Sequence, residues 1–383
     1  MNQATAIAIG ILLGLVSGLV PGMHHNFITT LIVSQYTSYW LLPLVISMLV
    51  SSQFFEFLRS IFLFVPEEGN VLAMHPIFRF VKEGKALVAL KLCAVGLVVS
   101  LIVGIVLSPL LIKIVPFIYS NIKRFVPYAL AVVVLYLIIR DKNKIAALLI
   151  FILSGVVGYF GLKHLNQPLL ILLTGFFGIS ILLQINQKIE RQIKSYKFKI
   201  QKKSICKGTI AALFSSFILA FIPAIGPSQA SLFSRGFLKS KEDFLIAIGA
   251  ISGFDIILSM VLLFTIGKAR IGSLEIIGKL FSFDFKTFVT SLIILLSVGI
   301  ISYFVSLKLG KIFVGFSEKI NYKILSLFVV SAILFASFYF DSFLGVLFLI
   351  LSTGIGMLAM KLKTNLSHCM GSLVIPVLMY FFL

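Results

Sequence analysis

Acidic side chains are scarce in this sequence, whose 383 residues include 13 Asp and Glu against 33 Lys and Arg. Charged residues of both signs make up 12% of the chain and hydrophobic residues 60%, whereas soluble domains carry about 25% charged residues. No soluble core could bury this much apolar surface, which excludes an ordinary soluble protein. The composition therefore predicts an all-α protein that crosses a membrane many times.

Several chemical signatures are also missing. The cysteines Cys93, Cys206 and Cys369 lack CxxC spacing, which argues against a disulfide framework or a cysteine metal cluster. The sequence has no G-x-x-x-x-G-K-[ST] phosphate-binding loop, no Ser-His-Asp order and no zinc-protease motif. We therefore expect neither an enzyme nor an ATP-driven pump, and no cofactor or bound metal. Because the first residues carry no positive charge, we also expect the first apolar run to remain in the mature protein.

Two short apolar runs each stop at a proline and continue as a second short arm. All four pieces are shorter than the about 20 residues that a helix needs to cross the membrane. Each pair therefore predicts a re-entrant hairpin, which is tolerated only inside protein or beside a water-filled cavity. The alternative is a pair of tilted helices with a proline at an interface. The pieces are residues 5–20 and 27–39 around Pro21, and residues 208–222 and 229–238 around Pro223.

Longer apolar segments follow each hairpin, five in each half. Because five is odd, the second hairpin enters from the opposite face, which predicts two inverted-topology repeats of the kind found in many secondary transporters. The halves are residues 1–186 and 208–383, joined by a basic linker at 187–207. The predicted spans are 41–64, 86–116, 125–139, 145–162 and 168–184, then 244–266, 287–306, 324–340, 343–360 and 367–382.

The net charge of +20 lies mostly in the loops between these spans. With the linker in the cytoplasm, most Lys and Arg fall on the cytoplasmic loops, as the positive-inside rule requires, and both termini lie outside. No basic face carries interleaved aromatic residues, so we interpret the charge as a sign of topology and of anionic lipid headgroups rather than of nucleic acid.

Polar residues and glycines gather at both predicted hairpin tips. The start of the second arm offers free N–H groups and a helix dipole that favour an anion, and glycine allows a ligand close to the backbone. Asn26 and Ser228 are candidate N-caps. In the alternative interpretation, the tip residues only cap and shape the bend. The candidate substrate-binding residues are Pro21, Gly22, His24, His25, Asn26 and Thr29 in the first tip, and Pro223, Gly226, Ser228 and Gln229 in the second.

The adjacent histidines do not have the i, i+4 spacing of a helical metal site, since in a helix they would point about 100° apart. One of them could relay a proton or contact an anion. Acidic residues inside spans face a bundle interior or a cavity, so Glu56 and Asp255 are candidates for coupling to H⁺ or Na⁺. Glu56 has the alternative of a structural ion pair with Arg59 on the same helix face. Asp255 has no basic neighbour in the sequence.

Several motifs together resemble the large membrane subunit of the tripartite tricarboxylate transporters, and especially its small archaeal branch of predicted permeases. The first hairpin matches through Gly14, Gly18, Pro21 and Gly22, and the second through Pro223, Gly226 and Pro227. Segments 54–68, 75–84, 249–255 and 263–270 complete the resemblance.

The resemblance implies ion-driven uptake of a carboxylate. It also implies help from a small membrane subunit and an extracytoplasmic binding protein. A homodimer is a further possibility. Because bacterial polyprenyl-phosphate translocases also use paired hairpins, a lipid-phosphate translocase is the alternative, and a membrane enzyme that uses His24 or His25 with a carboxylate is a third class.

Overall fold

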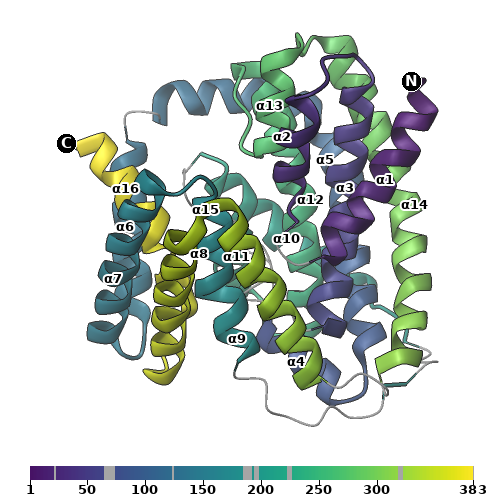
Figure 1. Cartoon of the computed structure of the whole chain (residues 1–383). Helices are drawn as coiled ribbons and strands as arrows, with labels where there is room; N and C mark the ends of the chain where they lie inside the picture. The colour runs from purple at the N-terminus through teal and green to yellow at the C-terminus, as the bar shows by residue number, and fades with distance from the viewer. Residues whose placement is uncertain are drawn as a thin grey trace.

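The chain forms an all-helical bundle in the computed structural model (Figure 1). The structure describes residues 1–20, 23–63, 74–122, 125–183, 192–193, 198–221, 227–317 and 322–382. Within these ranges, 6 helical segments are long and apolar enough to cross a membrane. This confirms an all-α protein with multiple membrane spans. The six segments are Leu41–Leu63, Ala86–Asn121, Lys144–His164, Lys241–Ile266, Phe285–Gly315 and Val330–Lys361.

The first half of the chain alternates long and short helices. A π-helical turn, η1, extends α3 without a break, and a second π-helical turn, η3, joins α8 to α9. The elements are α1 (Gln3–Leu19), α2 (His25–Val33), α3 (Leu41–Leu58), η1 (Arg59–Leu63), α4 (Met74–Lys82), α5 (Ala86–Ile122), α6 (Val126–Arg140), α7 (Lys144–His164), α8 (Pro168–Leu173), η3 (Thr174–Ile179) and α9 (Ser180–Leu182).

The second half repeats this order of long and short elements. The short helices α2 and α4 have counterparts in α11 and α13, and the long helices α3 and α5 in α12 and α14. The elements are α10 (Lys202–Leu219), α11 (Pro227–Phe237), α12 (Lys241–Ile266), α13 (Gly272–Leu280), α14 (Phe285–Ser317), α15 (Tyr322–Lys361), the 3-10 turn η4 (Leu366–Met370) and α16 (Gly371–Phe382).

The break predicted between the spans 324–340 and 343–360 is observed, because α15 turns at Asp341 and Ser342 through non-helical backbone angles. Two other details differ from the sequence-based expectation. The short amphipathic helices α4 and α13 were not predicted, because their few apolar residues alternate with charged ones. Helix α10 begins at Lys202, inside the segment assigned to the linker.

Two helices lie at the centre of the bundle. The most apolar stretch of α3 with η1 is 89% buried and that of α12 is 94% buried, whereas the other four candidate spans are each 39% buried. The four less buried spans therefore present one side to lipid, while α3 and α12 are surrounded by protein. Glu56 and Asp255 lie on these two central helices.

Helix α1 packs on α3 through a stripe of glycines. A Cβ atom added to Gly10 would lie 2.4 Å from the backbone oxygen of Leu44, and one on Gly14 would lie 1.9 Å from the hydroxyl of Ser51. A Cβ on Gly18 would lie 2.5 Å from the Cβ of Phe55. Small residues at such spacing let membrane helices approach closely, so the glycines hold α1 against the central helix α3.

The contacts between helices also recur between the halves. Helix α1 packs on α3 as α10 packs on α12, and α12 packs on α5 as α3 packs on α14. The pairing of α7 with α16 recurs as the pairing of α15 with η3. Several of the long-range helix pairs thus have a counterpart in the other half of the chain.

Two apolar cores divide the helices into two groups. One core joins α3, α5, α12 and α14, and a second joins residues of α7, α8, η3, α15 and η4. Figure 1 shows α1, α3 and α14 on the right and α6, α7 and α16 on the left. A smaller core links the groups where α6 and α16 meet α10, α11 and α12.

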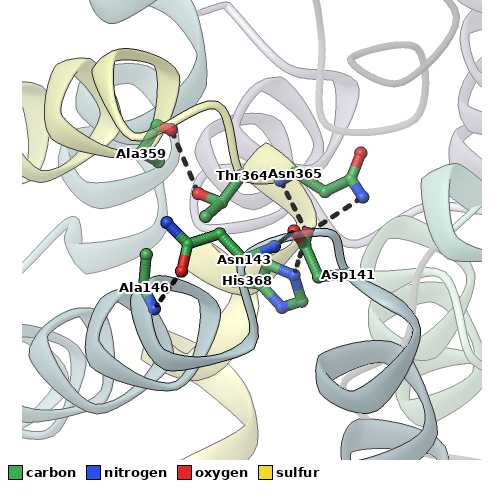
Figure 2. A network of polar contacts seen from close by, with 7 residues as sticks. All are labelled: Asp141, Asn143, Ala146, Ala359, Thr364, Asn365 and His368. Atoms are coloured by element: carbon green, nitrogen blue, oxygen red, sulfur yellow. Dashed lines mark hydrogen bonds and ion pairs between the residues drawn. The ribbon is translucent and has the colours of Figure 1, made fainter.

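The buried Asp141 connects the turn after α6 to the segment just before the last helix (Figure 2). Its carboxylate accepts hydrogen bonds from the backbone N–H of Asn143 (3.0 Å) and of Asn365 (3.0 Å), and lies 2.9 Å from Nε2 of His368. Burial raises the pKa of Asp141, but the hydrogen bonds from Asn365, Asn143 and His368 outweigh burial and hold the pKa below its ordinary value.

A second aspartate makes the matching contact in the other half. Asp341, at the turn inside α15, accepts hydrogen bonds from the backbone N–H groups of Asn166 and Gln167, just before α8. Each half therefore supplies an aspartate that caps the last helical segment of the other half. This exchange connects the two halves by hydrogen bonds near their ends.

Candidate functional site at the first hairpin

Helix α2 brings two histidines against the central helix α3. His24 is the N-cap of α2, and its Nδ1 accepts the backbone N–H of Asn26 at 3.2 Å. His25 is the first residue of α2 and is 4% exposed; its Nδ1 lies 3.5 Å from the hydroxyl of Ser52 on α3. The hairpin thus closes on α3 through polar side chains.

The two imidazoles and the Glu56 carboxylate form one cluster. One ligand atom from each of His24, His25 and Glu56 lies within 4.8 Å of the others. Glu56 is 5% exposed, and its carboxylate oxygens accept hydrogen bonds from the Gln53 amide at 3.4 Å. The structure therefore assembles three of the predicted site residues around one buried point.

The expectation that the two histidine rings point apart is wrong. Their ring centroids lie 3.8 Å apart with an interplanar angle of 37°. That expectation placed both residues in a helix, but His24 is the N-cap and has extended backbone angles, with φ −75° and ψ 146°. One extended residue ahead of the helix is enough to turn the first ring over the second.

Arg59 adds a positive charge to this cluster. It is 1% exposed, and its Nη1 donates to the backbone oxygens of Val20 (3.1 Å) and Ser17 (3.5 Å) at the end of α1. Its charge also acts on Glu56 and on His24. Arg59 begins the π-helical turn η1, and such turns occur frequently at functional sites. The sequence indicated Arg59 only as a partner of Glu56.

Two other residues of the first tip make hydrogen bonds to the backbone. Asn26 was expected to cap α2, but its side-chain oxygen accepts the backbone N–H of Ser273 at 2.8 Å and so caps α13. The Thr29 hydroxyl, which is fully buried, donates to the backbone oxygen of His25 at 2.8 Å. Asn26 therefore joins the first hairpin to the second half of the chain.

The second acidic candidate lies in a direct ion pair. Asp255 Oδ1 lies 3.0 Å from Nε of Arg270, and the two side chains are 18% and 17% exposed. Asp255 has no basic neighbour along its own helix, and its partner Arg270 reaches it because the chain after α12 turns back toward it. The Ser259 hydroxyl fixes this turn by accepting the backbone N–H groups of Arg270 and Ile271, each at 2.9 Å.

The remaining candidates cannot be placed in the site. Pro21, Gly22, Pro223 and Gly226 lie outside the described residues. Ser228 and Gln229 are in α11, which begins at Pro227, so Ser228 lies inside the helix rather than at its N-cap. The substrate-binding role of all these residues stays a prediction.

The cluster of His24, His25, Glu56 and Arg59 can perform three kinds of chemistry. It contains a buried cation and N–H donors that suit an anion, and imidazole and carboxylate groups that can exchange a proton. The same imidazoles and carboxylate could also contact a metal ion. No sequence motif predicts the cluster as a whole, because α2 and α3 bring it together only in the folded chain.

Comparison with known proteins agrees with these features. The model of the tripartite tricarboxylate transporter TctA family matches residues 5–371. An uncharacterized protein of Methanocaldococcus jannaschii is 28% identical, with 98% of each chain covered. No solved structure matches. The match to the family model spans nearly the whole chain, from the first hairpin to the last helix, and the chain belongs to the tripartite tricarboxylate transporter TctA family.

Proposed function

We propose that this membrane transporter moves a small carboxylate anion by coupling it to an ion gradient, with the anion bound at the tip of the first hairpin. The observation that carries the proposal is the cluster in which His24 and His25 of α2 meet Glu56 of the central helix and its neighbour Arg59, with His25, Glu56 and Arg59 buried. A buried guanidinium next to an imidazole N–H donor is a suitable partner for a carboxylate. The family name points to tricarboxylates as the class of substrate.

Two inverted-topology repeats are part of this proposal. The recurrence of element order, the matching helix pairs and the exchanged caps at Asp141 and Asp341 support it. Under this arrangement each hairpin, α1 with α2 and α10 with α11, enters from its own face, and the substrate lies between the tips. The second tip at Pro223, Gly226, Ser228 and Gln229 then completes the site.

The proposed topology places the basic linker 187–207 in the cytoplasm and both termini outside. In Figure 1 the N-terminus, α2 and α13 lie at the upper end of the bundle and α4 lies at the lower end. Cysteine labelling from one side of sealed vesicles tests this: a label in the loop at 163–167 should react from the side opposite to one in the linker. Reaction of both from the same side would contradict the inverted arrangement.

The family also suggests partners. A tripartite system includes a small membrane subunit and an extracytoplasmic binding protein, and we propose that this chain is the large membrane component of such a system. Co-purification with the products of adjacent genes tests this. Full citrate transport by the isolated chain would show that the partners are dispensable.

The alternative function is translocation of a polyprenyl phosphate. It is favoured by the lipid-facing sides of the two hairpins, where Leu12 is 61% exposed on α1 and Ile210 is 61% exposed on α10. A lipid headgroup could enter sideways past such a hairpin. Both functions place an anion at the tips, so binding measurements must separate them.

Thermal-shift measurements on the purified protein decide between the two functions. Citrate, succinate and a polyprenyl phosphate are compared for wild type, His24→Asn and the control His164→Asn, which changes an exposed histidine at the end of α7. We expect citrate to stabilise wild type and the control but not His24→Asn. Stabilisation by the polyprenyl phosphate alone would overturn the carboxylate proposal.

A further inference from the structure

The hydrogen bonds around His25 determine which of its nitrogens carries the proton. The hydroxyl of Ser52 donates to the backbone oxygen of Leu49 at 2.8 Å. Its single proton is therefore used, and its oxygen can only accept from Nδ1 of His25, 3.5 Å away. Neutral His25 is thus protonated at Nδ1, which leaves a lone pair on Nε2.

This lone pair is buried without a partner. His25 is 4% exposed, and within the described part of the chain its Nε2 has no hydrogen-bond partner. Buried polar atoms are nearly always satisfied, and an exception calls for a functional explanation. The carboxylate of Glu56 lies in the same cluster, within 4.8 Å between ligand atoms. A proton between His25 Nε2 and Glu56 would satisfy both groups.

His24 has the opposite tautomer. Its Nδ1 accepts the backbone N–H of Asn26 at 3.2 Å, so its proton must be on Nε2. His24 is therefore a hydrogen-bond donor toward the cluster and has no free lone pair for a metal ion. One imidazole and one carboxylate remain as ligands, which is fewer than the three or four protein ligands of a zinc site. The cluster suits a proton better than a metal ion.

We propose that the coupling ion is a proton, which is held between Nε2 of His25 and the carboxylate of Glu56. This inference rests on the proposed transport function and identifies its coupling site. The proton enters from water on one side of the membrane, binds to this pair and is released to water on the other side. No other group is oxidised, reduced or transferred.

Charge explains why proton and substrate would bind together. Proton binding to the pair of His25 and Glu56 adds one positive charge to the cluster. An anionic carboxyl group bound beside the pair can neutralise this added charge. A net charge is costly in a buried site, so each ligand favours binding of the other, and this coupling is reciprocal.

Few charged side chains in the described part of the chain act on His25 and Glu56. Among the described residues, the charges that act on Glu56 and His25 come from Arg59 and His24. Helix α1 has no titratable side chain between Gln3 and Leu19. On α13, Glu275 pairs with Lys279 at 3.5 Å, and the helices α5 and α14 contribute no charge to either group.

The second acidic candidate is less suited to carry the proton. Asp255 already pairs with Arg270 at 3.0 Å. Its carboxylate would have to break this ion pair to bind a proton. We therefore assign proton coupling to the first half of the chain and a structural ion pair to the second.

The tautomers can be tested without any substrate. Nitrogen-15 NMR of histidine-labelled protein in nanodiscs distinguishes protonated Nδ1 from protonated Nε2, and His24→Asn and His25→Asn assign the signals. We expect neutral His24 to be protonated at Nε2 and neutral His25 at Nδ1. A neutral His25 protonated at Nε2 would overturn the proposal, as would coordination of added Zn²⁺ by both rings.

Coupling is tested in proteoliposomes with radiolabelled citrate as the probe. A pH gradient at equal Na⁺ should accumulate citrate at least tenfold in wild type. Glu56→Gln should lose this accumulation and retain citrate–citrate exchange. Glu83→Gln, the same substitution at a glutamate whose side chain is 47% exposed, should behave as wild type.

The outcomes distinguish a failure of proton coupling from a failure of the proposed carboxylate transport. Accumulation by a Na⁺ gradient but not by a pH gradient would overturn proton coupling while the transport function stands. Unchanged pH-driven accumulation in Glu56→Gln would also overturn it. If wild type neither exchanges nor accumulates citrate, the carboxylate function fails, and the NMR tautomers still decide whether the cluster can hold a proton as described.

Discussion

The acidic side chains on the two central helices of this transporter have different partners. In the first half, Glu56 on α3 shares a closed site with two histidines and Arg59. In the second half, Asp255 on α12 forms a direct pair with Arg270 and remains partly exposed. The central helices correspond in the order of elements, so the difference comes from the side chains rather than from the architecture.

The residues that pack the first helix of each half against its central helix also differ. The first hairpin lies against α3 through Gly10, Gly14 and Gly18. The aligned positions in α10 are Ala212, Ser216 and Ala220. A helix without side chains on one face can approach its neighbour more closely than one with methyl or hydroxymethyl groups.

The largest expected effect is on the packing of the first hairpin. Gly14→Ala places a Cβ atom 1.9 Å from the Ser51 hydroxyl and 2.8 Å from the backbone oxygen of Met48, and the required shift should cost about 3 kcal/mol. Ser216→Ala, the aligned change in the second hairpin, should cost less than about 0.5 kcal/mol because it removes only a hydroxyl. Unfolding in mixed micelles measures both. Equal losses would remove the contrast between the hairpins.

The next effect concerns the ion pair of the second half. Asp255→Asn removes the carboxylate opposite Arg270 and should lower the free energy of unfolding by about 2 kcal/mol, since it leaves a largely buried guanidinium without this carboxylate. The double variant Asp255→Asn with Arg270→Gln should recover most of this loss. Thermal denaturation in detergent measures both. Loss of proton-driven transport in the double variant, with stability intact, would move the coupling site to the second half.

The exchanged caps are expected to contribute somewhat less. Asp141→Asn should lower stability at neutral pH by about 1–2 kcal/mol, because it removes the charge that binds Asn143, Asn365 and His368. The folded-state pKa of Asp141 is lowered, so its stabilisation is present above the ordinary pKa of about 3.9 and is lost as pH falls through the folded value.

The corresponding measurement compares melting temperatures at neutral and acidic pH. The difference between wild type and Asp141→Asn should shrink below about pH 4, near the ordinary pKa of an aspartate. Asp341→Asn should lose stability by a similar amount at neutral pH, because it also caps two backbone N–H positions of the other half. A pH-independent difference for Asp141→Asn would show that its charge does not stabilise the turn.

The smallest expected effect is at the contact between the halves near the site. Asn26→Ala removes the side-chain cap of α13 at Ser273 and should cost about 1 kcal/mol, as loss of an N-cap does. Citrate affinity should change less than threefold if the residue only supports the hairpin. Loss of citrate binding with little change in stability would instead restore Asn26 as a substrate ligand.

Much of the fold could be predicted from local patterns. Apolar runs located every long span, because each helix in lipid must satisfy its own backbone. The short helices α4 and α13 could not be predicted in this way, since their apolar faces depend on what covers them. The turn at Asp341 and Ser342, in contrast, lies where the predicted spans 324–340 and 343–360 separate.

The sequence singled out His24, His25 and Glu56 of the candidate site but not their arrangement. The unusual His24–His25 pair and the intramembrane Glu56 stood out because buried polar groups are costly. The pairing of Asp255 with Arg270 and the use of Asn26 to cap α13 were missed. Both contacts join residues that are far apart in the sequence and meet only because the chain turns back on itself. Local residue spacing does not predict such contacts.

The sequence by itself determined that this protein is an all-helical membrane protein, because composition and the length of apolar runs decide whether a chain can be solvated by lipid, and its motifs indicated a transporter through their resemblance to a known family. It also determined which polar residues must be buried. Only the tertiary structure decided which of them meet: it placed the N-cap His24 over His25, brought both to Glu56 and Arg59, and paired Asp255 with Arg270. The physical reason is that contacts between distant segments depend on helix packing, which local sequence patterns do not specify.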